Sequence, residues 1–299
     1  MSEQESAHIT AQTTLAPALK GWKIYLEDQD SSPHTVKAFI GDLNILASYL
    51  PPDRTLGSIT TNDLNNFLDW MQNERKAPCS PKTLARRITS LKAFFGWLHD
   101  SGVLLVDPAE KVVQQSVRSP LPEVLTADEM DAVLEIAKAY GSGPDPDRRY
   151  YALVKLLLDT GIKKGECLDL NPNHLHLDAP KPILFVRYDE PDYRYKERKI
   201  ELTEAWVEAY QDYARQYDLS DRVFPWSPRR LEYLLEDLSD DAGLDKHLSF
   251  RMCRWTCAIV DWRTGMERDK IRQKLGISEV QWREVSQKLR RLDDQLDKE

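Results

Sequence analysis

The chain carries the stretch SPKTLARRITSLKAFFGWL at residues 80–98, and this stretch indicates the class of fold. Ser80 is a typical N-cap residue, and Pro81 suits the first position of a helix. Apolar side chains then recur every three or four residues, which predicts a helix with one buried face; they are Leu84, Ile88, Leu91, Phe95 and Leu98. Basic side chains lie off this stripe at Lys82, Arg86 and Lys92.

The preceding sequence repeats the pattern. Ser32-Pro33 precedes a second apolar stripe over residues 36–50, and Thr61 begins a third helical segment. Gly102 ends the run of helical patterns, because glycine is a poor helix former. The sequence therefore predicts a helical N-terminal domain over residues 1–113.

A polar segment follows and predicts a linker over residues 114–124, with serines and prolines at Ser116, Ser119, Pro120 and Pro122. The remaining residues, 125–299, predict a second domain. It begins with a helix at Thr126, contains a β-hairpin over residues 183–202, and is mainly helical from Glu204 onward. The predicted fold is mainly α with a small β-hairpin or sheet.

Composition indicates a globular chain: 41% of the 299 residues are apolar. No apolar run approaches the roughly 20 residues that span a membrane, and the polar first 14 residues lack the apolar core of a secretory signal, so we predict a cytoplasmic protein. The net charge of −8 argues against a nucleic-acid partner. Its distribution argues for one, because residues 75–99 hold six basic residues and no acid, and residues 246–274 hold eight against three acids.

The cysteines and histidines do not indicate a metal site. Only Cys253 and Cys257 lie close in sequence, one helical turn apart, and we expect reduced core thiols. His174 and His176 have no partner pair nearby, whereas a zinc site needs more ligands at short spacing. We predict no metal and no cofactor.

Several segments in order resemble the tyrosine recombinase (phage integrase) family, which includes the recombinases that resolve chromosome dimers. They are SPHTVKAF at residues 32–39, SPKTLARR at 80–87, LKAFFGWL at 91–98 and LPEVLT at 121–126. The resemblance covers nearly the whole chain. It implies a C-shaped clamp on duplex DNA, in which a helical core-binding domain precedes an α+β catalytic-type domain. It also implies phosphoryl transfer, in which a tyrosine attacks a DNA phosphate held by two arginines, histidines and a lysine.

The family's first arginine motif resembles TGIKKGECLDL at residues 160–170, where Lys163 stands at the arginine position. A lysine keeps the positive charge but lacks the planar fork that grips two phosphate oxygens. A surface lysine pair at a helix start is an equally good interpretation.

The stretch that carries the family's lysine resembles YRYKERKIEL at residues 193–202, with Tyr193 at the lysine position. Arg194 or Lys196 are the candidate substitutes. Their charges suit contact with the DNA backbone, and the alternative is a strand edge protected by solvated charge.

The box that reads His-x-x-Arg-His in many family members resembles RMCRWTCA at residues 251–258. Arg254 then keeps the second arginine, Arg251 replaces the histidine, and Trp255 supports the pocket. An arginine cannot shuttle protons near neutral pH, because its pKa is above about 12, but it can neutralise a phosphate.

The nucleophile is the largest departure from the family. Leu275-Gly276-Ile277-Ser278 resembles the family's Leu-Gly-His-Ser segment, and in that register Ser286 takes the place of the tyrosine. No tyrosine follows Tyr233, and no histidine follows His247 to activate a serine. Since one preorganised donor is worth about 10²–10³ in rate, these replacements predict no useful turnover. A polar residue on a surface helix is the other interpretation of Ser286.

We therefore predict a protein that binds duplex DNA without efficient cleavage. The expected DNA contacts of the first domain are Thr35, Lys37, Lys82, Arg86 and Arg87. Those of the second domain are Lys163, Arg194, Lys196, Arg251 and Arg254. Two alternatives stay open: a site-specific recombinase or integrase with an atypical site, and a regulatory subunit of an active recombinase that no longer binds DNA.

The last helical pattern, over residues 279–298, offers a surface for a partner. Apolar residues repeat at spacings of three and four from Trp282 to Leu296. This face fits either the chain's own domain or a neighbouring subunit, as a homo-oligomer or a hetero-oligomer with an active recombinase.

Overall fold

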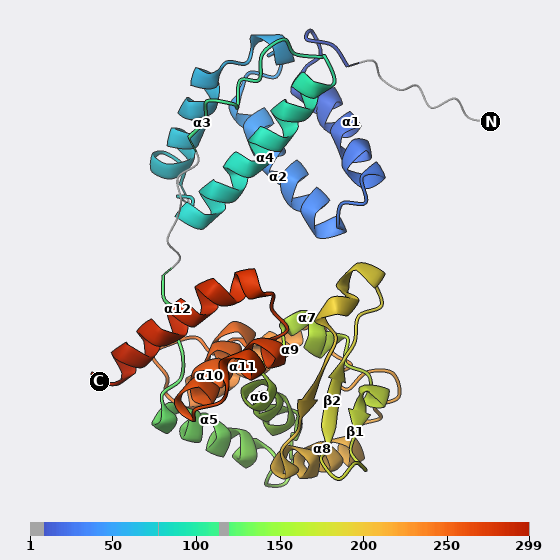
Figure 1. Ribbon diagram of the computed structural model, residues 1–299, viewed down its shortest axis with the longest axis vertical. Helices are drawn as coiled ribbons and strands as arrows, with labels where there is room; N and C mark the ends of the chain where they lie inside the picture. Colours follow the sequence, from blue (N-terminus) through green and yellow to red (C-terminus); the bar gives the residue numbers. More distant parts are fainter. Residues whose placement is uncertain (1–8, 77, 114–119, 299) are drawn as a thin grey trace, which may run out of the picture. The chain divides into compact units, whose positions relative to one another are not determined.

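The computed structural model describes residues 9–298 except 77 and 114–119 (Figure 1). The chain divides into two compact units, with the boundary immediately before Pro120. We call the residues before Pro120 unit 1 and the residues from Pro120 onward unit 2. Because residues 114–119 lie outside the described part, the linker over 114–124 and the domains 1–113 and 125–299 stay predictions.

The regular elements among the described residues of unit 1 are helices. Ser32 and Ser80 act as N-caps, because each hydroxyl accepts a hydrogen bond from the backbone N–H three residues later, and a proline follows each at the first helical position. Both predicted helix starts are confirmed. The helices are α1 (Leu15–Asp28), α2 (Pro33–Tyr49), α3 (Thr61–Asn73) and α4 (Pro81–Asp100), with a short 3-10 turn η1 (Leu56–Ser58) before α3.

One apolar core holds these helices together. Trp22 of α1 is 1% exposed and meets the ring of Phe94 of α4 edge to face, with centroids 5.1 Å apart. Leu43 and Leu46 of α2 are fully buried in the same cluster. The apolar stripes predicted from the sequence are thus the buried faces.

Unit 2 combines helices with a small sheet, so the predicted mainly α fold with a small β element is confirmed. Figure 1 shows the sheet on one side of unit 2 and α6 in the interior of the unit. The helices are α5 (Ala127–Tyr140), α6 (Arg149–Thr160), α7 (Lys164–Leu168), α8 (Glu204–Gln216), α9 (Pro228–Asp241), α10 (Phe250–Arg263), α11 (Arg268–Leu275) and α12 (Glu279–Leu296). The strands are β1 (Leu175–His176), β2 (Ile183–Val186) and β3 (Arg198–Glu201).

The sheet is antiparallel in the order β1-β2-β3, and β2 pairs with β3 as the predicted hairpin. The prediction was wrong about the extent of the second strand. Pro191 begins a 3-10 helix, η3 (Pro191–Lys196), where the sequence pattern suggested strand from Tyr193 onward. Proline has no N–H for a strand ladder and its fixed φ suits a helical start, so β3 begins only at Arg198.

Unit 2 has two apolar clusters. The larger surrounds α6, whose Leu153, Leu156 and Leu157 are fully buried. The smaller lies between α10, α11 and α12, where Leu289 is fully buried and the indole of Trp262 donates to Asp293 at 3.1 Å. The apolar face of α12 therefore packs within its own unit.

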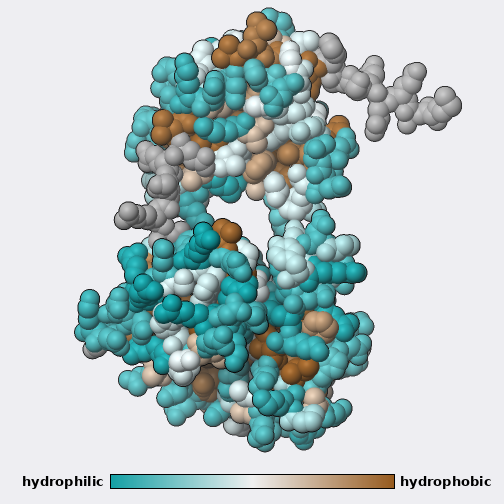
Figure 2. Space-filling model, in the orientation of Figure 1, coloured by the Kyte–Doolittle hydropathy of each residue, from teal (hydrophilic) through white to brown (hydrophobic). Residues whose placement is uncertain are grey.

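Hydrophilic residues cover most of the face of each unit that Figure 2 shows, and apolar residues form small separate patches. None of the helices in the described part of the chain is long and apolar enough to span a membrane. The cysteines Cys167, Cys253 and Cys257 are buried and unpaired, as expected of core thiols.

Gly161 and Gly265 both have left-handed backbones, but only Gly161 is closely surrounded by other atoms. Substituting each by alanine therefore distinguishes backbone strain from steric crowding. Gly161, which ends α6, has φ 59°, and a Cβ there would lie 3.2 Å from the Cys257 sulfur. Gly265 has φ 78° with open space around it. We predict that Gly265→Ala lowers the free energy of unfolding by about 1 kcal/mol and Gly161→Ala by about 2–4 kcal/mol. Urea unfolding followed by tryptophan fluorescence measures both, and equal losses would contradict the tight packing of α6 on α10.

Candidate functional site

A buried carboxylate organises the cluster of charges in unit 2. Glu166 lies in the first turn of α7, with its side chain 2% exposed. Both its oxygens accept from the guanidinium of Arg198, at 2.9 and 2.8 Å. The hydroxyl of Tyr188 donates to the same carboxylate at 2.5 Å, and the backbone N–H of Lys163 donates at 2.8 Å. Such a fork-to-fork pair fixes orientation as well as charge.

The pKa values of these groups follow from burial and from their neighbours. Burial alone would raise the pKa of Glu166, but the hydrogen bonds and charge of Arg198 outweigh it and hold the pKa at about 2. Burial, together with Glu166, raises the pKa of Tyr188. Burial lowers the pKa of Lys163, although the Glu166 carboxylate, 3.5 Å from the ammonium, opposes that shift.

Arg254 of α10 lies in the same cluster and joins two helix ends. Its Nη1 donates to the carbonyl of Gly161 at the end of α6, and its Nη2 donates to the carbonyl of Leu275 at the end of α11. Arg198 similarly donates from Nε to the carbonyl of Lys274, at 2.6 Å. These bonds satisfy carbonyls that helix ends leave without intrahelical partners. Burial lowers the pKa of Arg254 to about 10, so the guanidinium stays charged at neutral pH.

The hairpin residues predicted from the sequence lie on η3. The ammonium of Lys196 stands 4.0 Å from the centre of the Tyr193 ring and 5.2 Å from that of Tyr195, while Arg194 is exposed. Next to η3, a pocket of about 500 Å³ lies between β3 and α11. Its lining includes four basic residues, Lys196, Arg198, Lys199 and Arg272, and one acid, Glu197.

The other predicted site residues of unit 2 make their contacts outside the Glu166 cluster. Arg251 is exposed and lines a pocket of about 310 Å³ with residues 120–123. Trp255 packs against the smaller apolar cluster with α12. Ser286 is half-buried on α12, and its hydroxyl donates to the carbonyl of Arg283 at 3.2 Å. The described contacts bring no base to that hydroxyl.

The residues of unit 1 that were predicted to contact DNA differ in their exposure. Lys37 and Lys82 are exposed, and the Thr35 hydroxyl lies 2.9 Å from that of Ser32 at the start of α2. Arg86 is exposed, but Arg87 is buried in the core and pairs with Asp42. We therefore remove Arg87 from the expected DNA contacts and assign it to the fold.

The sequence pattern carried signals for the residues that the prediction missed. Arg87 lies three residues after Leu84 and four before Leu91, which places it on the apolar stripe of α4. Asp42 lies three residues after Phe39 and four before Leu46, on the apolar stripe of α2. A charge on a buried face needs a partner, so these two positions predict each other. Glu166, three residues after Lys163, matched the spacing of a capping box.

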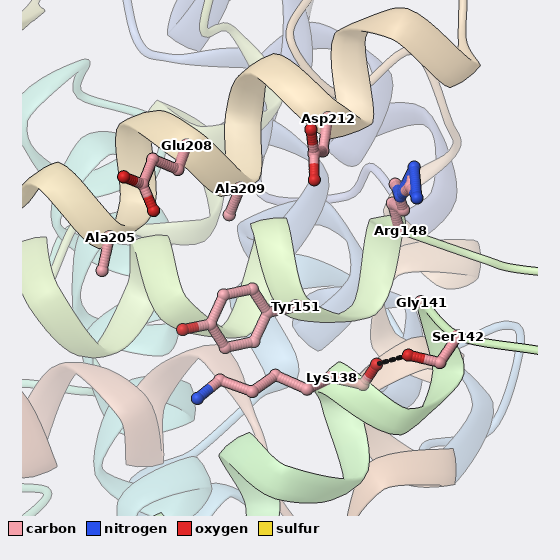
Figure 3. Close-up of a pocket in the computed structure, with 9 residues that line it drawn as sticks. All are labelled: Lys138, Gly141, Ser142, Arg148, Tyr151, Ala205, Glu208, Ala209 and Asp212. Carbon is pink, nitrogen blue, oxygen red and sulfur yellow. Dashed lines mark hydrogen bonds between the residues drawn. The ribbon is translucent and has the colours of Figure 1, made fainter.

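A second hollow in unit 2 lies away from this cluster, between α5 and α8, with Tyr151 of α6 at its centre (Figure 3). Figure 3 shows Lys138 of α5 below the tyrosine and Glu208 and Asp212 of α8 above it. The hollow measures about 490 Å³. Its lining holds charges of both signs and no histidine or cysteine.

Two family models match the chain. The phage integrase N-terminal SAM-like domain matches residues 19–102, within unit 1, and the phage integrase family matches residues 123–283, within unit 2. The second match alone covers more than half of the 299 residues. The chain belongs to the phage integrase family, that is, to the tyrosine recombinases.

Curated relatives share about half of the chain. The tyrosine recombinase XerD of Listeria innocua is 31% identical over 146 residues, which cover 49% of this chain and 48% of that protein. The tyrosine recombinase XerC of Mycobacterium sp. (strain JLS) is 31% identical over 148 residues, with 48% of each chain covered. The chain spans about half the length of the curated relatives it matches.

Solved structures share the fold at low identity. The site-specific recombinase XerH bound to a palindromic difH substrate matches with a TM-score of 0.73 and 17% identity, covering 94% of this chain and 82% of that one. A lambda integrase dimer bound to a COC′ core site matches with a TM-score of 0.72 and 16% identity, covering 91% of this chain and 77% of that one. These likenesses establish the fold.

Because of the Glu166–Arg198 pair, we expect the free energy of unfolding to depend on pH. The pKa of Glu166 in the folded chain, about 2, lies below its ordinary value of 4.5, so its contribution is complete above about pH 4.5 and is lost as the pH falls toward 2. We predict that Glu166→Gln lowers the free energy of unfolding by about 3 kcal/mol at pH 7, because it leaves Arg198 buried without a counter-charge, and by less at pH 3.

Urea unfolding at the two pH values measures this difference. The matched control is Glu232→Gln, which breaks the exposed pair with Lys164 and should cost less than about 1 kcal/mol at either pH. Equal losses for the two variants at pH 7 would contradict the central role of Glu166.

Proposed function

We propose that this chain binds duplex DNA as a clamp and does not cleave it. The proposal is carried by Ser286, which takes the place of the family's tyrosine in the register set by residues 275–278. Its hydroxyl donates to the carbonyl of Arg283 on its own helix, and no hydrogen bond among the described residues joins it to a base. A serine hydroxyl without a base is a poor nucleophile near neutral pH. The phosphate-binding charges, in contrast, are largely retained.

Cations in unit 2 support a contact with the DNA backbone. The side chain of Lys163 is 38% exposed, and Arg194 and Arg251 are exposed. Arg254 uses two of its five N–H groups on carbonyls, which leaves others for a phosphate oxygen. We assign these residues and Lys196 to phosphate contacts, which position a protein on a duplex without specifying sequence.

Cations in unit 1 support a second contact. Lys37 and Lys82 are exposed near the starts of α2 and α4, and Arg86 is exposed on α4. The XerH structure is bound to a palindromic difH substrate and the lambda integrase structure to a COC′ core site, and this chain shares their fold over more than 90% of its length. We propose that the two units grip the duplex together.

A role as a regulatory subunit is the second candidate. The net charge of −8 favours it, because an acidic chain gains less from long-range attraction to DNA. The packing of α12 within its own unit does not supply a free apolar face for the partner. Truncation after Gly276 should therefore destabilise unit 2 rather than only change the oligomeric state.

Binding to a 30-base-pair duplex tests the clamp. We predict that the affinity falls at least tenfold between 50 and 200 mM salt, because each phosphate contact releases counterions. The double variant Lys163→Ala with Arg251→Ala should bind several-fold more weakly and with a shallower salt dependence. The control is Lys181→Ala, which removes an exposed lysine paired with Glu201. Unchanged affinity in the double variant would remove these residues from the interface.

Supercoiled plasmid tests the loss of cleavage. Breaking and rejoining one strand releases supercoils, so we predict that neither the native chain nor Ser286→Ala relaxes the plasmid. The expected loss of turnover follows from the replaced nucleophile and donors. Relaxation by the native chain that disappears in Ser286→Ala would establish a serine nucleophile and contradict the proposal.

A further inference from the structure

Asp42 is a buried acid that serves three donors on one neighbouring helix. It lies on α2, 4% exposed, and faces α4. One oxygen accepts from Arg86 Nη1 at 2.5 Å and from the Ser90 hydroxyl at 2.8 Å. The other accepts from Arg87 Nε at 3.3 Å. One carboxylate therefore connects the core of unit 1 to a surface arginine.

The two arginines differ in what remains accessible. The Arg87 side chain is 9% exposed, and its Nη1 points to the sulfurs of Cys79 and Met71. The Arg86 side chain is 42% exposed. Within the described residues, all the hydrogen bonds of the Arg86 side chain leave from Nη1, which also approaches the Ala38 carbonyl at 3.4 Å. Its Nε and Nη2 are left for another partner.

The contact with Asp42 thus fixes the orientation of the Arg86 guanidinium, whereas the nearby lysines are exposed and flexible. Lys37 follows the start of α2, next to Ala38, and Lys82 lies one turn before Arg86 on α4. Both are exposed, and a lysine carries a point charge on a flexible stem, which suits a phosphate. A planar guanidinium in a fixed orientation suits the paired acceptors O6 and N7 of guanine.

We propose that Arg86 determines sequence specificity in unit 1 by donating to the major-groove edge of a guanine, and that Asp42 is its positioning residue. The inference rests on the proposed binding of duplex DNA and deepens it. Lys37 and Lys82 contact phosphates on either side. The buried Arg87 pairs with the Asp42 carboxylate from inside the core, while Arg86 turns its free N–H groups outward.

The test begins with a random duplex pool bound to the full chain at low salt, from which the preferred sequence is recovered. Arg86→Ala should lower affinity for that sequence by about 5–150-fold, and should abolish the preference at one guanine while leaving other positions unchanged. Lys82→Ala should weaken all sequences equally and reduce the salt dependence by about one phosphate contact. Equal weakening of all sequences by Arg86→Ala would overturn the inference. Failure of the native chain to retain any duplex would instead overturn the proposed function.

The role of Asp42 needs a variant that keeps the fold, because Asp42→Asn alone leaves Arg87 buried without a counter-charge. The double variant Asp42→Asn with Arg87→Met removes both buried charges. We expect it to fold and to lose the same single-guanine preference as Arg86→Ala, with no further loss when Arg86→Ala is added. A folded double variant that keeps the preference would show that Asp42 is only structural. If it does not fold, the Arg86→Ala comparison still decides the assignment of Arg86.

Discussion

The paired carboxylate of Glu166 is the interaction on which the site in unit 2 depends. Arg198 is held by its two oxygens and in turn holds the carbonyl of Lys274 at the end of α11. Arg254 ties that same end to the end of α6. Segments distant in sequence are therefore fixed to one another through charges. Because a buried charge is costly without a partner, loss of Glu166 would disturb all of them together.

Unit 1 uses the same physical solution with Asp42. Asp42 pairs with two arginines of α4, and Glu166 pairs with Arg198 of β3, so part of the positive charge is used inside each unit. This limits what the basic islands of the sequence mean. Arg87 and Arg198 stabilise the folded chain, while Arg86 and Lys163 keep part of their side chains exposed. The net charge does not distinguish the buried cations from the partly exposed ones, whereas the exposure of each side chain does.

The sequence predicted the helical elements well because their signals are local. Ser32, Ser80 and Thr126 cap helices where the patterns predicted starts, and the apolar stripes became the core. The hairpin was predicted, but the strand pattern did not reveal that Pro191 begins a 3-10 helix. The residue type of Arg87 suggested exposure, whereas its place on the apolar stripe of α4 and that of Asp42, 45 positions away, on the stripe of α2 indicated a buried pair.

The candidate site was predicted less completely. The family resemblance assigned Lys163 and Arg254 to one phosphate site, which stays a prediction, and in the structure both lie near Glu166. The role of Glu166 was not predicted, because an acid among basic residues gives no local sign that it pairs with a residue 32 positions later. The surroundings of the Ser286 hydroxyl also depend on how α12 packs in unit 2, which its local sequence pattern did not predict.

We propose that this chain retains the recombinase fold for DNA binding and has lost the cleavage chemistry. The most direct test incubates the chain with duplexes of its preferred sequence that carry a nick at successive positions, so that the short fragment released by cleavage diffuses away and the cleaved strand stays trapped on the protein. Complexes are then separated under native and under denaturing conditions. We predict retention of the duplex in the native separation and complete release under denaturing conditions. A protein–DNA adduct that survives denaturation would contradict the account.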